Sequence, residues 1–225
     1  MVYSVDCVDY SNIMQGRYDR MIDDPWPTWN PPPGPYYSKP LEPWMFDAFP
    51  SRLEVHPSYP LTDVAMYGLL AVNEGIKRAI EDIEPGVHQF VPVKVIYGVT
   101  AGPELEPAVV TTMNAQGRFH RYVPERKTPA IEPTEHQYYT LWINHRLPGT
   151  RLDPASPIVW DRNVKIYPND WANIPGLPLV LRAEIIGNRQ LWNVGVYTMI
   201  SDTLYERLRR DGLGSGWRFE KQIVV

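Results

Sequence analysis

The residues best suited to acid–base or metal chemistry are scattered along this chain. The five histidines lie far apart in the sequence: His56, His88, His120, His136 and His145. Glu135-His136 and His145 flank one predicted strand and stand too far apart along it to form a single metal site. The sequence holds no His-Glu-x-x-His motif and no paired cysteine ligands. We therefore predict no bound metal.

Two patterns that can accompany catalysis have simpler structural explanations. Cys7 is the only cysteine, which excludes an intramolecular disulfide, and its place in a first strand is typical of an inert core residue. The run from Gly212 to Gly216 resembles a phosphate loop, but it follows a predicted helix and offers no helix N-terminus to an anion. We interpret this run as a helix cap and turn. The sequence indicates neither a catalytic residue nor a cofactor.

Composition limits the classes of partner. Of the 225 residues 44% are hydrophobic, enough for a substantial core, and the net charge of −4 is too small to indicate a nucleic-acid or membrane partner. The basic cluster of Arg207, Arg209, Arg210, Arg218 and Lys221 is explained by compensation of a helix dipole and by pairing of Glu206 with Arg210. No signal peptide or transmembrane-length apolar run is visible, which favours a cytoplasmic location.

The most biased segment runs from Tyr18 to Tyr37 and combines prolines with aromatic and acidic side chains. Proline at this density prevents a helix or a central strand, so we expect an extended loop. Such a loop either covers the core or is offered to a partner, and Trp and Tyr dominate binding energies at interfaces. The candidate partner-binding residues are Asp23, Asp24, Trp26, Trp29, Tyr36 and Tyr37.

The last part of the chain, from Ile200 to Val225, predicts one helix followed by one strand. Ser201 is placed to cap the helix, Leu204 and Leu208 share one face, and Gly212 can end the helix. The same plan occurs upstream, with the following aligned pairs: Asn73 with Ser201, Glu74 with Asp202, Ile76 with Leu204 and Ile80 with Leu208. The sequence thus predicts two similar helix–strand units, although any capped helix before a strand shares this pattern.

Strands outnumber helices in the rest of the chain. Alternation and turn residues predict strands at 1–9, 87–96, 108–114, 118–123, 138–143, 179–186 and 191–199, whereas 62–71 fits a helix or a buried strand. We expect an α+β fold with a mixed or largely antiparallel sheet and two main helices, in a single domain spanning 1–225. Within it lie the Pro/Trp-rich segment, 1–50, and the two helix–strand units, 60–115 and 178–225.

Several of these positions resemble a bacterial family of immunity proteins, the eleventh among the immunity families of polymorphic toxins. The matching residues are Ile200, Ser201, Leu204, Leu208, Gly212, Gly216 and Phe219, with Ile76 to Ile83, Phe90 to Val93 and Val109 to Asn114 upstream. The resemblance leaves the Pro/Trp-rich segment and residues 124–177 unmatched. It implies a non-catalytic protein that neutralises a cognate toxin by direct binding.

The expected partner is therefore a cognate protein toxin, and the acidic pair Asp23-Asp24 would suit a basic toxin domain. Two alternatives from other classes stay open. One is an enzyme whose site is spread across strands, which a perturbed polar cluster in a pocket would favour. The other is a homo-oligomeric scaffold protein, which a symmetric interface between copies would favour.

Overall fold

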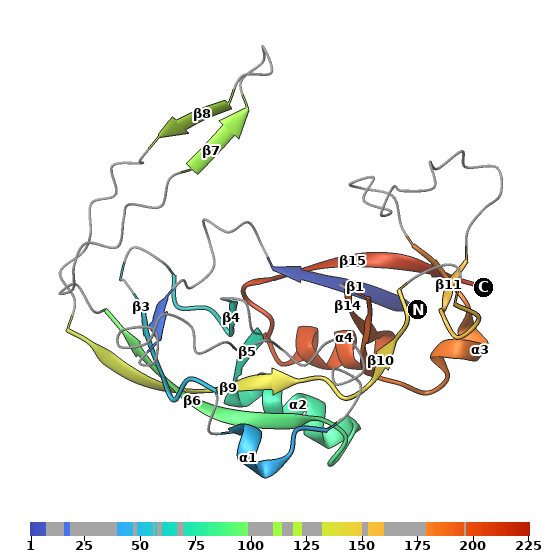
Figure 1. The fold of residues 1–225 in the computed structure, drawn as a ribbon, viewed down its shortest axis with the longest axis horizontal. Helices are drawn as coiled ribbons and strands as arrows, with labels where there is room; N and C mark the ends of the chain where they lie inside the picture. Colours follow the sequence, from blue (N-terminus) through green and yellow to red (C-terminus); the bar gives the residue numbers. More distant parts are fainter. Residues whose placement is uncertain are drawn as a thin grey trace.

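The computed structural model describes residues 1–7, 16–18, 40–46, 49–55, 57, 60–66, 70–98, 110–113, 119–122, 132–149, 153–159, 179–195 and 197–225. This part of the chain has the predicted α+β fold. Two mixed, curled sheets and a pair of contacting helices pack around a shared core (Figure 1).

The first sheet has the strand order β2-β3-β6-β9-β5-β4. Its strands are β2 (Gly16–Tyr18), β3 (Arg52–Val55), β4 (Val64–Met66), β5 (Leu70–Asn73), β6 (Gln89–Tyr97) and β9 (Thr134–Trp142). Every neighbouring pair is antiparallel except β3 with β6. The middle strand β9 makes backbone ladders with β6 on one side and β5 on the other.

The second sheet has the order β10-β13-β14-β1-β15-β12-β11. Its strands are β1 (Val2–Cys7), β10 (Arg146–Leu147), β11 (Ile158–Val159), β12 (Val180–Leu181), β13 (Leu191–Val194), β14 (Tyr197–Ser201) and β15 (Trp217–Val224). β1 lies between β14 and β15 and is antiparallel to both, whereas β12 runs parallel to β15 and β10 parallel to β13. β7 (Val110–Met113) and β8 (Phe119–Tyr122) form a separate antiparallel pair, as predicted.

Each main helix begins at a side-chain cap provided by the last residue of a strand. α2 (Glu74–Ile83) follows β5, and the side chain of Asn73 accepts a hydrogen bond from the amide of Ile76 at 3.0 Å. α4 (Asp202–Arg210) follows β14, and Ser201 accepts from the amide of Leu204 at 3.1 Å. Each cap satisfies an amide that has no partner inside its helix. The short helices are α1 (Pro43–Phe46) and α3 (Ala183–Ile186).

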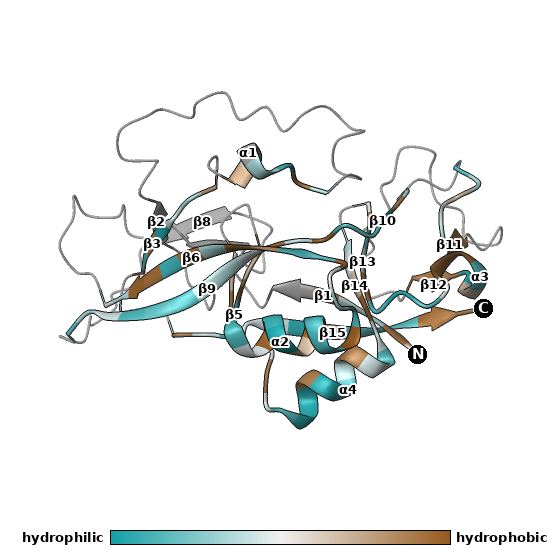
Figure 2. Ribbon diagram, turned by 90° about the horizontal axis from the view of Figure 1, so that it is seen from below, coloured by the Kyte–Doolittle hydropathy of each residue, from teal (hydrophilic) through white to brown (hydrophobic). Residues whose placement is uncertain are grey.

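The main hydrophobic core lies where the two helices meet both sheets. The helices contribute five side chains that are at most 1% exposed: Ile76, Ala79, Ile80, Leu204 and Leu208. The sheets contribute Val5, Val64, Val72, Leu141, Ile143, Leu191, Ile200 and Trp217. Hydrophilic residues occupy the rest of both helices, as the mixed colours of α2 and α4 in Figure 2 show. The two helices therefore share the capped, amphipathic plan that the sequence predicts.

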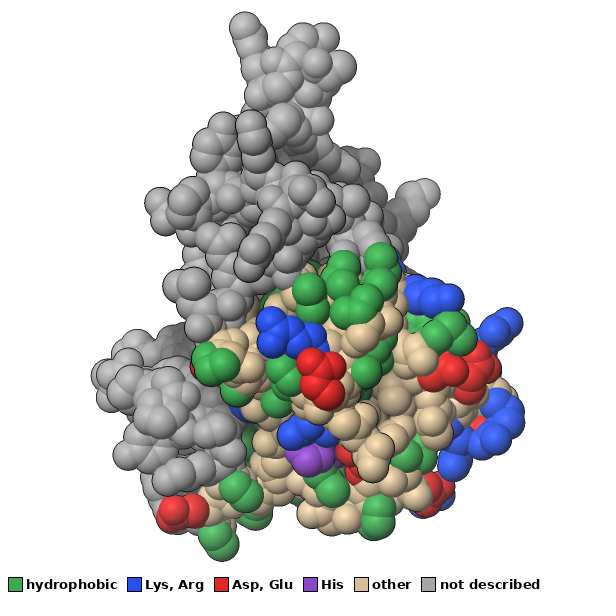
Figure 3. Space-filling view, turned by 90° about the vertical axis from the view of Figure 1, so that its right-hand side faces the viewer, with side chains coloured by type: hydrophobic (Ala, Val, Ile, Leu, Met, Phe, Trp, Pro, Cys, Tyr) green, Lys and Arg blue, Asp and Glu red, His purple; other side chains and the backbone are tan. Residues whose placement is uncertain are grey.

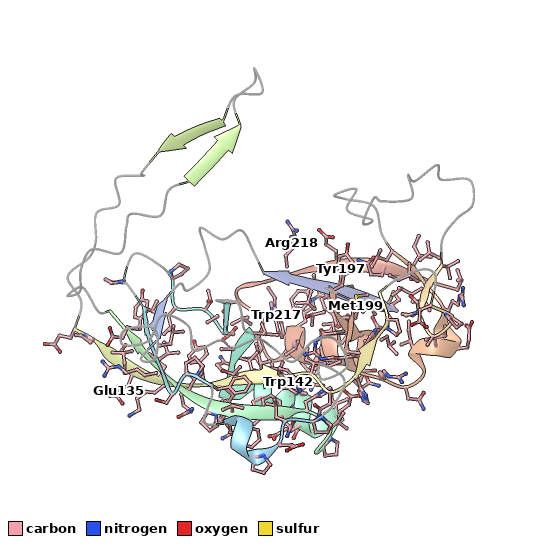
Figure 4. The ribbon with its side chains drawn as sticks, viewed as in Figure 1. Glu135, Trp142, Tyr197, Met199, Trp217 and Arg218 are labelled. Carbon is pink, nitrogen blue, oxygen red and sulfur yellow. The ribbon has the colours of Figure 1, made fainter. Side chains whose placement is uncertain are left out.

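Part of the second sheet is buried on both faces, since Leu191 and Trp192, and Met199 and Ile200, are consecutive residues that are all buried. Trp217 and Arg218 are consecutive on β15, and Figure 4 shows Trp217 pointing into the core between the sheets and Arg218 pointing away from it. On the opposite face from Trp217, Met199 joins a second buried cluster with Val2 and Trp192. Burial on two faces explains why this sheet contains apolar residues at consecutive positions.

Three local predictions from the sequence are wrong. The strand predicted at 191–199 is two strands, β13 and β14, which pair with each other in antiparallel fashion, because the chain turns at Gly195 with φ +58°. The strand predicted at 179–186 ends at Leu181, and the chain then turns into α3. The strand ends where its pairing with β15 ends: Val225 donates its amide to the carbonyl of Leu181 and accepts the amide of Ala183, and α3 begins after this last contact. Arg210 forms its ion pair with Asp211, at 3.3 Å, and not the predicted pair with Glu206. The ambiguous segment 62–71 contributes strands β4 and β5.

We expect Leu208→Ala and Ile80→Ala each to lower the free energy of unfolding by about 2–5 kcal/mol, because both create a cavity in the shared core. Denaturant unfolding followed by circular dichroism measures the loss. Arg209→Ala, on the exposed side of α4, is the control and should stay within about 0.5 kcal/mol of the parent. An unchanged midpoint for Leu208→Ala would contradict the role assigned to this helix face.

Candidate functional site

The six candidate partner-binding residues, Asp23, Asp24, Trp26, Trp29, Tyr36 and Tyr37, lie outside the described residues, as does the side chain of Cys7. In the described part, polar side chains gather at two junctions between the two main helix–strand units. The Glu84 junction comprises Glu84, His88, Asn144, His145, Gln190 and Leu191. The Asp63 junction comprises Asp63, Asn73, Gly214 and Ser215.

The Glu84 junction is built on the residue that follows the last turn of α2. The Glu84 carboxylate accepts hydrogen bonds from the backbone amides of Gln190 at 2.8 Å and Leu191 at 3.0 Å, where β13 begins. It also lies 2.9 Å from Nε2 of His88. Because the carboxylate is only 9% exposed, these contacts fix the end of α2 to a strand 106 residues further along the chain.

His88 is held in one tautomer by its neighbours. Its Nδ1 accepts the amide hydrogen of Asn144 at 3.3 Å, so its Nε2 carries the proton that is donated to Glu84. The next residue, His145, meets the His88 ring edge-on with centroids 5.5 Å apart. Its Nε2 lies 3.6 Å from the Glu84 carboxylate. The buried His88 ring thus connects the end of α2 to the segment that follows β9.

The surroundings favour a charged Glu84 and a neutral His145. Burial acts to raise the pKa of Glu84, but the hydrogen bonds from His88 and from the amides of Gln190 and Leu191 outweigh it and lower that pKa. Burial lowers the pKa of His145, although the Glu84 carboxylate opposes this effect. A carboxylate that accepts two amides and an imidazole proton has little affinity for another proton. We therefore interpret this junction as a structural contact rather than an acid–base pair.

The Asp63 junction has a similar character. One oxygen of the Asp63 carboxylate accepts the amides of Gly214 at 3.0 Å and Ser215 at 2.9 Å, and also the Ser215 hydroxyl at 2.7 Å. The other oxygen accepts the side-chain amide of Asn73 at 2.6 Å. Gly212 has φ +68°, which confirms the predicted helix cap and turn. The glycine-rich run does surround an anion, and that anion is the protein's own carboxylate.

A shallow hollow of about 410 Å³ adjoins the Asp63 junction. Its lining includes Leu61, Thr62, Asp63, Asn73, Glu74, Gly75, His136, Gln137 and Tyr138. Several polar groups there already have partners: the Tyr138 hydroxyl donates to the carbonyl of Thr62, and Nε2 of His136 lies 2.8 Å from the Thr134 hydroxyl. Burial raises the pKa of Tyr138, so its hydroxyl stays protonated. The hollow therefore shows no group set aside for chemistry among the described residues.

Sequence reasoning missed both junctions. One partial signal was available, since Glu84 and His88 lie close together in the sequence, on either side of the helix stop Pro85-Gly86. Nothing in the sequence indicates that His145 and Gln190 join them, or that Asp63 meets Ser215. These contacts join distant segments, so they depend on how the two sheets pack.

Within the described ranges, no three His, Cys, Asp or Glu side chains are placed to hold a metal ion. Figure 3 shows one face, on which basic and acidic side chains are interspersed. Arg207, from the basic cluster, lies 2.9 Å from Asp82 of α2 and thus helps to join the two helices.

The free energy of unfolding should fall as the pH is lowered from about 7.5 to about 2.5, because both shifted groups at the Glu84 junction bind protons less readily in the folded state. The His145 contribution is full above its usual pKa of 6.5 and decreases as the pH falls below it. The Glu84 contribution is full above 4.5 and is lost as the pH falls through its lowered pKa. Denaturant unfolding across this range measures both.

Two variants separate these contributions. Glu84→Gln should cost about 1.5–3 kcal/mol near pH 7, because a side-chain amide cannot accept all the hydrogen bonds that the carboxylate accepts. It should also remove the decrease in stability below pH 4.5. His145→Gln should remove mainly the decrease that begins near pH 6.5. Parental pH profiles in both variants would show that other groups control acid stability.

We expect Gly216→Ala to destabilise the protein more than Gly86→Ala. Both glycines have positive φ, so each alanine should cost about 1–2 kcal/mol in backbone strain. At Gly216 the new Cβ would also come within 3.1 Å of the carbonyl oxygen of Val64, whereas nothing lies within 4 Å at Gly86. Paired thermal unfolding curves test the difference, and equal losses would mean that the Gly216 turn relaxes freely.

Comparison with known proteins provides no relative from which a function could be transferred. No family model, no curated protein and no solved structure matches this chain. Among the described residues, no helix is both long and apolar enough to span a membrane. A functional proposal therefore depends on the residues themselves and on the resemblance described from the sequence.

Proposed function

We propose that this chain is a non-catalytic, immunity-type binding protein of bacteria that neutralises a cognate protein toxin by direct contact in the cytoplasm. The observation that carries the proposal is the use made of the chain's polar clusters. The carboxylates of Glu84 and Asp63 bind backbone amides across the two junctions and stabilise the fold. Groups that would suggest acid–base catalysis are thus explained by structure in the described part of the chain.

The residues that carry the family resemblance have structural roles here. Ser201 caps α4, Leu204 and Leu208 are buried beneath it, and Gly212 and Gly216 adopt positive φ after it. Such residues define a fold that presents a binding surface, and they do not touch a partner themselves. The proposed contact surface therefore lies in a segment that the resemblance leaves unmatched.

The segment from Asp23 to Tyr37 has the composition expected of that surface. Its prolines restrict the chain before docking, so less conformational entropy is lost on binding than for a flexible loop. Its carboxylates would attract a basic toxin domain at long range, and its tryptophan and tyrosine side chains would supply apolar area once docked. This proposal requires the segment to be accessible to a partner.

The first test is whether the reading frame beside this gene encodes a toxin domain, and the second is co-expression of such a domain with this chain. Growth of the host should require this chain, and the two proteins should co-purify in a 1:1 complex. A host that the chain does not protect, with no complex formed, would remove the proposed function. An enzymatic function would be indicated if protection required only catalytic amounts of the chain and no stable complex.

Charge reversal and aromatic truncation should affect different steps of binding. Asp23→Lys with Asp24→Lys should slow association and reduce its salt dependence, because exposed charges act at long range and are screened. Trp29→Ala should speed dissociation, with a loss of binding free energy of about 2 kcal/mol or more. Both rates are measured by surface plasmon resonance at two salt concentrations.

The matched control is Glu132→Lys with Glu135→Lys, which changes the net charge equally at two exposed positions outside the segment. It should leave the association rate close to that of the parent. If Trp29→Ala unfolds the protein while the charge reversals leave both rates unchanged, the segment covers the core and the partner binds elsewhere.

A further inference from the structure

The two sheets are built from the same series of elements. In chain order, β2-β3-β4-β5-α2-β6 corresponds to β11-β12-β13-β14-α4-β15. The additions are α1, β7 and β8 around the first series and β10 and α3 around the second. The places in the sheets correspond too: β2-β3-β6, a middle strand, then β5-β4, against β11-β12-β15, a middle strand, then β14-β13. β3 pairs with β6 in parallel fashion, and so does β12 with β15. The other pairs within each series are antiparallel.

The middle strands break this simple succession. β1 precedes the first series in the chain but lies in the second sheet, between β14 and β15. β9 precedes the second series but lies in the first sheet, between β5 and β6. Each series is thus preceded by one strand that completes the sheet of the other series.

The equivalence extends to the pairing of single residues. Tyr139 of β9 pairs with Val72, and Tyr3 of β1 pairs with Ile200, the residue that aligns with Val72. On the opposite side, Leu141 pairs with Phe90 and Val5 pairs with Phe219. The two phenylalanines stand one place out of register in an ungapped sequence alignment, yet the strand register makes them equivalent.

The side chains at these positions also make equivalent contacts. Glu74 and Asp202 are the first residues of α2 and α4; Glu74 shares a hydrogen bond with Tyr139, and Asp202 accepts one from Tyr3 at 3.4 Å. One turn into each helix, a side chain lies against the tyrosine and the phenylalanine of its own sheet. In the first sheet, Nζ of Lys77 is 5.0 Å from the ring centroid of Tyr139 and 5.7 Å from that of Phe90. In the second sheet, the ring centroid of Tyr205 is 4.0 Å from that of Tyr3 and 5.2 Å from that of Phe219.

The two junctions are related in the same way. Asp63 precedes β4 as Gln190 precedes β13, and each forms hydrogen bonds with the partner half: the Asp63 carboxylate accepts, and the Gln190 amide donates. The carbonyl of Asp63 accepts the amide of Asn73, and the carbonyl of Gln190 accepts the amide of Ser201, each at 2.9 Å. Residues that follow α4 bind Asp63, and the residue that follows α2 binds Gln190. The contact between the halves is therefore reciprocal, as in an interface between two copies of one subunit.

We propose that this chain is two copies of one strand-exchanging unit joined in tandem, and that each half is the obligate binding partner of the other. The N-terminal half, up to β8, offers the gap between β5 and β6, which accepts β9. The C-terminal half, from β9 onward, offers the gap between β14 and β15, which accepts β1. Without its middle strand, each sheet would expose two rows of unpaired backbone groups, so neither half is complete alone.

The experiment begins with the full chain, in which a specific protease site is inserted between Tyr122 and Thr134. The folded protein is cut, and mass spectrometry verifies complete cleavage. We expect the two halves to stay together as a 1:1 complex on size exclusion in the absence of denaturant. After separation in urea and removal of the urea, each isolated half should lose most of its helical circular dichroism, and mixing should restore both the signal and the complex.

The outcomes are distinct. Halves that part without denaturant, or an isolated half that keeps its helical signal as a monomer, would overturn the proposal. A folded homodimer of one isolated half would support it, because β1 or β9 could then fill the equivalent gap in a second copy. None of these outcomes depends on the toxin, so they are independent of the proposed function.

A urea titration of the cut protein decides the matter if an isolated half precipitates. Separation of the halves, followed by fluorescence transfer between labels, should coincide with loss of the helical signal. Tyr138→Ala in β9 removes a side chain buried in the first sheet and should shift both transitions to lower urea together. Separation at lower urea with the helices retained would show that the halves fold independently.

Discussion

Both sheets depend on a middle strand that is antiparallel to the strands on its two sides. β9 pairs with β5 and β6, and β1 pairs with β14 and β15, so each satisfies the facing backbone groups of two neighbours at once. The strands on either side are the ones that a main helix connects, β5 with β6 and β14 with β15. Each helix therefore connects two strands that are not neighbours in the sheet, because a third strand lies between them. That third strand comes from another part of the chain, and the sheet is continuous only when it is present.

The caps of the two main helices link the strands to the core. Asn73 and Ser201 fix where α2 and α4 begin, and the same side chains bond to Asp63 and Gln190 at the start of the neighbouring hairpins. Cap and hairpin are thus held by one set of contacts. The two helices pack against each other and against both sheets, so a substitution at Ile80 or Leu208 should destabilise both sheets together. This explains why one core, rather than one for each half, dominates the interior.

Charged groups secure the contact between the halves where apolar packing ends. The Glu84 carboxylate accepts hydrogen bonds from the amides of Gln190 and Leu191, where β13 begins. The Asp63 carboxylate accepts hydrogen bonds from the amides of Gly214 and Ser215, which follow α4. A carboxylate that binds backbone amides is effective at such a place, since it satisfies donors that no strand or helix pairs. The polar residues of these junctions thus have structural roles, and the Pro/Trp-rich segment remains the proposed contact surface.

The local patterns of the sequence were sufficient for much of the fold. An α+β class, the caps at Asn73 and Ser201, the buried faces of both helices, and strands such as β1, β6, β7, β8, β9 and β15 all follow from spacing and residue type. The helix–strand unit could be recognised twice, because its cap and apolar positions repeat. Where local pattern was ambiguous, as between 62 and 71, or misleading, as at Ala183 to Ile186, a contact with a distant strand decided the structure.

The candidate site was less accessible to such reasoning. The sequence by itself determined where helices begin and which faces they bury, since these depend on neighbours within a few residues. Only the tertiary structure decided that β1 and β9 are exchanged, that Phe90 and Phe219 are equivalent, and that Glu84, His88 and His145 meet. The physical reason is that strand order and register are set by backbone pairing between segments far apart in the chain, and no local periodicity specifies which segments will pair.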